Sequence, residues 1–89
     1  MNLYRISQNS NYGYDTYDSA VVCAENEEVA RSMNPRSLKD KDLPNLIDWL
    51  DNPYAWMWCE NPDMVKVELI GSAAPGLPQG VICASFNAG

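Results

Sequence analysis

Four pairs of carboxylates are the residues of this 89-residue chain whose spacing could support chemistry. The pairs are Asp15 and Asp18, Glu27 and Glu28, Asp40 and Asp42, and Asp48 and Asp51. Two neighbouring carboxylates can share a divalent cation, or can act as general acid and general base. None of the four spacings matches an EF-hand loop, which needs a longer ordered set of oxygen ligands. We therefore expect solvated charge at each pair and no metal site.

Nucleophilic catalysis is disfavoured by composition. The chain contains no histidine, so Ser–His and Cys–His pairs cannot form. The three cysteines form no CxxC motif, and we expect Cys23 and Cys83 to be small buried side chains in strands. Residues 73–80 lack the lysine and the following helix of a phosphate-binding loop. The sequence predicts a protein that is not an enzyme and has no cofactor.

Aromatic side chains in two groups are more informative. Tyrosines gather between residues 12 and 17, and one tyrosine and three tryptophans lie between residues 49 and 58. Tyr and Trp contribute much of the energy of binding surfaces, although in a chain with a single Phe we expect two of the three Trp to fill the core. The candidate partner-binding residues are Tyr12, Tyr14, Asp15, Tyr17, Asp18, Tyr54, Trp56 and Trp58.

Short strands and helices must position these groups. Alternating apolar residues predict strands at 3–7, 17–24, 64–72 and 81–86. A helix is expected at 26–33 with Asn26 as N-cap, and a second one from Leu43 that ends at Asn52-Pro53. The order β-β-α-α-β-β predicts an α+β fold: a four-stranded, mostly antiparallel sheet with short helices on one face. We expect a single domain over 1–89, with 36–62 as a helical and aromatic insertion.

Strand alternation also predicts which side chains share a face. Tyr4 and Ile6 should point into the core. Tyr17 should lie on the same face as Val21 and Cys23, at the edge of the core, with Asp18 on the other face.

The net charge of −6 narrows the class of partner. Direct binding to nucleic acid or to an anionic membrane needs clustered Lys and Arg, so neither is expected. A basic or nucleic-acid-binding protein remains an acceptable partner. An odd number of cysteines, the absence of a leader-like N-terminus and the lack of a long apolar run favour a reducing cytoplasm.

Several motifs resemble a family of short, mostly uncharacterised proteins of tailed bacteriophages and prophages. They are LYRISQ at 3–8, YDTYDSAVVCA at 14–24, ENEEVAR at 25–31, VKVELIG at 65–71 and GVICASFNAG at 80–89. The resemblance implies a phage context, in which small acidic proteins without catalytic residues often occlude a host protein, CRISPR effectors among them. It carries no site residue over to this chain.

These observations lead to one expected function and two alternatives. We expect a non-enzymatic phage accessory protein that binds and inhibits a host protein in the host cytoplasm, for example a defence inhibitor such as an anti-CRISPR. An oligomeric protein that binds or sequesters a nucleotide is the first alternative, and it requires Arg5, Arg31 and Arg36 to converge on phosphates. A minor structural or assembly protein of the virion is the second.

Overall fold

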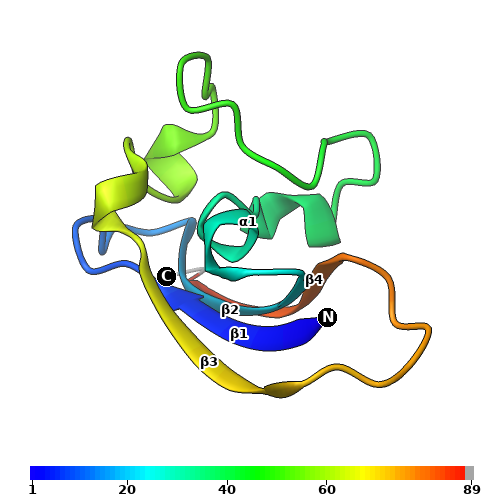
Figure 1. Cartoon of the computed structure of the whole chain (residues 1–89). Coiled ribbons are helices and arrows are strands. Elements are labelled where there is room, and N and C mark those ends of the chain that lie inside the picture. Colours follow the sequence, from blue (N-terminus) through cyan, green and yellow to red (C-terminus); the bar gives the residue numbers. More distant parts are fainter. Residues whose placement is uncertain (88–89) are drawn as a thin grey trace.

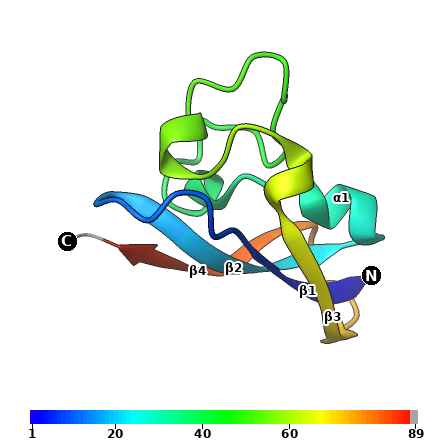
Figure 2. The same ribbon diagram turned by 90° about the vertical axis from the view of Figure 1, so that its left-hand side faces the viewer.

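Four strands form one antiparallel sheet in the computed structural model, which describes residues 1–87. The strands are β1 (Asn2–Ser7), β2 (Thr16–Ala24), β3 (Lys66–Ser72) and β4 (Gly80–Asn87), in the order β3-β1-β2-β4. The helix α1 (Glu27–Arg31) and the 3₁₀ helices η1 (Pro35–Leu38), η2 (Ala55–Met57) and η3 (Pro62–Met64) connect β2 to β3. Figure 1 shows that this connection lies over one face of the sheet, and Figure 2 shows the two layers from the side. The predicted α+β fold is confirmed.

The core lies between the sheet and the connection from β2 to β3. Tyr4 and Ile6 of β1 point into it, as their alternation predicts, whereas Arg5 lies on the uncovered face and pairs with Glu68 of β3. From the connection, Met33 and Trp58 are buried against the sheet. Burying these apolar side chains stabilises the two layers against each other.

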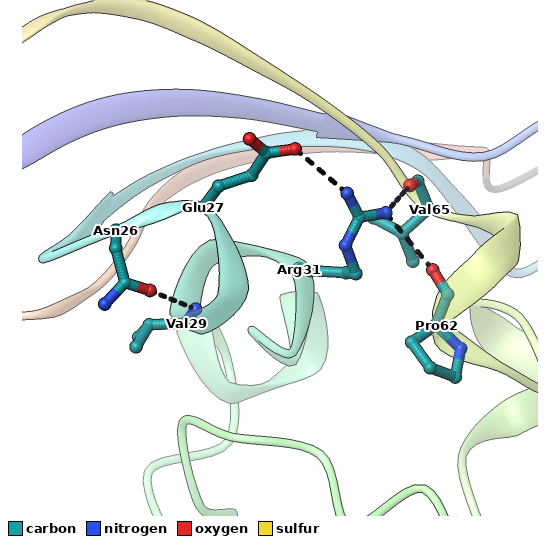
Figure 3. Close-up of polar contacts among 6 residues, drawn as sticks. All are labelled: Asn26, Glu27, Val29, Arg31, Pro62 and Val65. Atoms are coloured by element: carbon teal, nitrogen blue, oxygen red, sulfur yellow. Dashed lines mark hydrogen bonds and ion pairs between the residues drawn. The ribbon is translucent and has the colours of Figure 1, made fainter.

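Helix α1 is short, and side chains fix both of its ends. The Asn26 side chain accepts a hydrogen bond from the Val29 backbone N–H at 2.9 Å, which confirms the predicted N-cap. At the other end, the Arg31 guanidinium donates to the carbonyl of Val65 at 2.5 Å and to that of Pro62 at 3.4 Å. Figure 3 shows these contacts together with the ion pair from Arg31 to Glu27. Arg31 thus joins α1 to η3 and the start of β3.

Tyr17 packs in the core, as predicted, but its predicted alignment with Val21 and Cys23 is wrong because the register of the sheet shifts beside it. Tyr17 pairs with Phe86 of β4, and Ser19 pairs with Ser85, so Asp18 is an extra residue. A β-bulge of this kind breaks the two-residue alternation. Tyr17 therefore lies on the covered face, with its ring centroid 4.8 Å from that of Phe86.

The second predicted helix is also wrong, since residues 43–50 form turns and one isolated bridge. The Asn45 carbonyl accepts from the Asn34 N–H, and the Ile47 N–H donates to the Ser32 carbonyl, both at 2.7 Å. These bonds engage backbone groups that a helix would have used within itself. Leu50, whose spacing from Leu43 and Leu46 would place it on one face of that helix, is fully exposed. Residues 36–62 therefore cover the sheet mainly through loops and the short helices η1 and η2.

Candidate functional site

The connection between β1 and β2 presents two tyrosine rings to solvent. Tyr12 is 72% exposed and Tyr14 is 75% exposed, and they are among the most exposed large hydrophobic side chains of residues 1–87. Large aromatic side chains normally lose most of their exposed area on folding. Their exposure on one short loop makes this connection the first element of a candidate binding surface.

Gln8 organises the start of this loop. Its side chain is almost fully buried, at 8% relative exposure of the residue, and Oε1 accepts from the backbone N–H groups of Ser10 at 2.9 Å and Asn11 at 2.8 Å. Nε2 donates to the carbonyls of Asn11 at 2.8 Å and Tyr17 at 2.9 Å. The Gln8 side-chain amide therefore bonds backbone groups of the loop that have no strand partner.

The first residue of β2, Thr16, and the last residue of β4, Asn87, fix the other side of the loop. Thr16 Oγ1 donates to the Gly13 carbonyl at 2.6 Å, and Asn87 Nδ2 donates to the carbonyls of Tyr12 and Gly13 at 3.3 Å each. The Asp15 N–H donates to the Asn87 carbonyl at 2.6 Å. Asp15 has a φ of 60°, a left-handed conformation that Asp tolerates better than most residues. The backbone that carries the tyrosines is thus held from both ends.

A second segment joins the loop through Asn11. Its Nδ2 donates to the carbonyl of Trp56 at 2.6 Å and to that of Trp58 at 3.3 Å. Trp56, on η2, is 61% exposed. We call Tyr12, Tyr14 and Trp56 the aromatic surface. A cleft of about 190 Å³ lies beside it, and its walls come from Ser10, Asn11, Ala55, Trp56, Trp58, Cys59, Glu60 and Met64.

The structure divides the predicted partner-binding residues. Those exposed are Tyr12, Tyr14, Asp15, Asp18 and Trp56. Tyr54 is half-buried and packs against the core. Tyr17 and Trp58 are each only 2% exposed, so both predictions of a surface role are wrong; the bulge turns Tyr17 inward, and Trp58 fills the space between η2 and the sheet. Asp18 lines a separate hollow with Arg5 and Lys66.

Gln8, Asn11, Glu60 and Met64 are among the residues of the site that the sequence did not predict. In the run QNSNYG, the polar residues indicate a turn, and nothing local shows that Gln8 is buried or that Asn11 reaches η2. A Gln directly after a strand, followed by a loop rich in Asn and Tyr, is the signal that could have suggested an organised loop.

The cysteines differ in exposure. Cys23 is buried, as predicted, but Cys83 is exposed, because it points away from the covered face opposite Val21. Cys59 is buried, and burial raises the pKa of its thiol from 9.0 to about 11. Cys59 is therefore protonated and a poor nucleophile at neutral pH.

Two further observations concern ligands. Within residues 1–87, no group of three His, Cys, Asp or Glu side chains is placed to hold a metal ion. The three arginines of the nucleotide alternative lie on different parts of the fold. Arg5 is on the uncovered face of the sheet, Arg31 is bonded to η3 on the covered side, and Arg36 is on η1, which packs on β4.

Comparisons with known proteins leave the site to be interpreted from its own geometry. No protein-family model matches the chain. Searches of curated proteins and of solved structures also find no match. Across residues 1–87, no helix has the length and apolar character needed to cross a membrane.

Proposed function

We propose that this chain is a non-enzymatic phage accessory protein that binds a host protein through the aromatic surface and blocks that protein's function. The observation that carries the proposal is the organised loop that presents Tyr12 and Tyr14. A folded chain gains little for its own stability from two exposed rings. A partner gains from them, because a loop already held in one conformation loses little entropy on binding.

The composition of the surface supports the same function. Tyrosine and tryptophan supply large, amphipathic contact area at low conformational cost, as they do in antibody loops. Acidic side chains lie beside them at Asp15 and Glu60, and the chain carries a net charge of −6. This combination suits a basic partner surface, because complementary charge speeds association and fixes orientation.

Affinity capture from host lysates tests the proposal. Immobilised wild-type protein should retain a host protein in stoichiometric amount, and the double variant Tyr12→Ala/Tyr14→Ala should lose it. Truncating central aromatic anchors usually costs about 2 kcal/mol or more each, so Kd should rise by a factor of about 30 or more for each tyrosine removed. Leu50→Ala removes a fully exposed apolar side chain at residue 50 and should leave capture unchanged.

The outcomes distinguish specific from general adhesion. Absence of a stoichiometric partner across several host lysates contradicts the proposal. Equal loss of capture in Leu50→Ala would show that exposed apolar area in general, and not the aromatic surface, retains the protein. Inhibition of host defence, including an anti-CRISPR role, is tested by plating phage on defended hosts that express wild type or the double variant.

The nucleotide alternative has one observation in its favour. A hollow of about 400 Å³ lies between residues 37–45 and the start of β4, within the range of small-ligand sites. Lys41 is the single basic residue in its lining, and the three arginines lie elsewhere. A nucleotide at a hundredfold excess over Kd should stabilise the protein by about 2.7 kcal/mol, which a thermal-shift assay detects. A virion role predicts instead that the protein co-purifies with phage particles.

A further inference from the structure

The cleft beside the aromatic surface has the chemistry of a receptor for a cationic side chain. We infer that it binds the guanidinium group of an arginine that the partner protein inserts between Trp56, Glu60 and Met64. The inference rests on the proposed function, since the arginine belongs to the protein that the aromatic surface contacts. It adds the chemical class of residue that the site recognises.

The walls of the cleft are held in place before any ligand binds. Asn11 joins the loop to the backbone of residues 56 and 58 through its two hydrogen bonds, at 2.6 and 3.3 Å. Ser10 Oγ donates to Met64 Sδ at 3.5 Å, which joins the loop to η3. The buried Trp58 anchors the floor in the core. A cleft with three fixed walls can bind a side chain without first ordering itself.

The lining offers a cation two kinds of attraction. Trp56 is exposed over 61% of its surface, and the indole face is the best cation–π acceptor among side chains. Glu60 is exposed and adds a carboxylate to the same lining. Neither Lys nor Arg occurs among the lining residues of the cleft as described. The net charge of −6 adds a long-range attraction for cations.

The size of the cleft suits a side chain, and the chemistry of its lining favours arginine over lysine. Its volume is about 190 Å³. This is below the ~300 Å³ at which small-molecule pockets usually begin, so a side chain fits better than a nucleotide. A planar guanidinium stacks on aromatic faces and pairs with carboxylates through its N–H groups, and the cleft lining supplies one of each in Trp56 and Glu60. The more strongly hydrated ammonium of lysine satisfies both contacts less well.

Titration of the ¹⁵N-labelled full chain with N-acetyl-arginine amide tests the inference by NMR. Saturable shifts are expected at the Trp56 indole N–H, the Asn11 side-chain amide and the Glu60 backbone amide. The matched ligand is N-acetyl-citrulline amide, which has the same shape without the charge and should bind at least about fivefold more weakly. This pair of titrations needs no variant, so it does not depend on how a substitution affects folding.

Variants then assign the binding to the cleft. Trp56→Leu and Glu60→Gln should each weaken arginine binding by a factor of about five or more. Asp63→Asn removes a neighbouring exposed carboxylate that does not line the cleft, and it should leave the Kd within a factor of two. Each variant keeps the dispersed spectrum of the wild type if its fold is intact.

Three results would overturn the inference: no saturable shift at tens of millimolar ligand, equal binding of the citrulline compound, or equal weakening by Asp63→Asn. The last would indicate attraction to acidic charge in general. Failure here is distinguishable from failure of the proposed function. Capture of a partner that depends on Tyr12 and Tyr14, without arginine binding, leaves the function standing and removes the arginine site. Arginine binding without any captured partner would leave the arginine site standing and would remove the proposed function.

Discussion

Replacing Gln8 by Met should loosen the connection between β1 and β2, which we call the tyrosine loop, and lower the stability of the whole domain. The substitution preserves the length of the side chain but removes its hydrogen bonds to residues 10, 11 and 17. Loss of Nε2 leaves the buried Tyr17 carbonyl without that donor, which costs about 1–2 kcal/mol. Loss of the bonds to Ser10 and Asn11 costs about 0.5 kcal/mol for each of these two residues, because water can replace the bonds in part. We expect a total loss of about 2–3 kcal/mol.

Two measurements check this expectation. In urea denaturation the free energy of unfolding should fall by about 2–3 kcal/mol, and a loss of 2 kcal/mol corresponds to roughly 8–16 °C in Tm for a domain of this size. In hydrogen exchange, the Ser10 and Asn11 amides should exchange faster relative to the amides of β1, because they lose their acceptor.

The control is Gln79→Met, on the connection between β3 and β4, which should change the free energy of unfolding by less than about 0.5 kcal/mol. The reasoning is refuted if Gln8→Met stays within 0.5 kcal/mol of wild type and the two loop amides keep their exchange rates. That result would mean that the loop conformation does not depend on the buried amide.

The remaining predictions concern three other positions. Arg31→Met should lower the free energy of unfolding, measured by urea denaturation, by about 2 kcal/mol, because two carbonyls lose a charged donor. The control Lys66→Met removes an exposed ion pair and should change this free energy by less than about 1 kcal/mol. The contribution of Cys59 to the free energy of unfolding should be constant below pH 9 and should fall as pH rises from 9 to 11, because the thiol ionises first in the unfolded chain. Cys59→Ala should flatten this part of the curve of unfolding free energy against pH. An unchanged slope would contradict the raised pKa. Asp15→Val should destabilise by about 1–2 kcal/mol in the same urea assay because φ is positive, while Asp15→Gly should not; equal effects of the two would argue against the left-handed backbone.

Much of the fold follows from local pattern. The alternation in LYRIS predicts β1 and its buried Tyr4 and Ile6, and the polar connection predicts the hairpin with β2. Asn26 marks the start of α1 correctly, because its side chain satisfies an N–H only three residues away. The exposed Tyr12 and Tyr14 also follow from sequence, since they precede the paired part of β2.

The errors have a common physical origin in contacts between distant segments. The stripe of Leu43, Leu46 and Leu50 has helical spacing, but residues 45 and 47 bond to the segment after α1. Trp56 and Trp58 are two residues apart in similar sequence surroundings, yet one is exposed and the other is buried. Which of them faces the core depends on how η2 sits over the sheet, and no local pattern contains that information.

The sequence by itself determined the composition of this protein, with no histidine and a net charge of −6. Its pattern also predicted four strands of alternating apolar and polar residues and a pair of exposed tyrosines. Tertiary structure alone decided that a bulge at Asp18 separates Tyr17 from the face of Val21 and places it on the covered face of the sheet. It also brought Asn11 onto η2, which places Trp56 next to the tyrosine loop and forms the cleft with Glu60. The physical reason is that side-chain types are local properties, whereas backbone groups choose their hydrogen-bond partners among all segments that folding brings together.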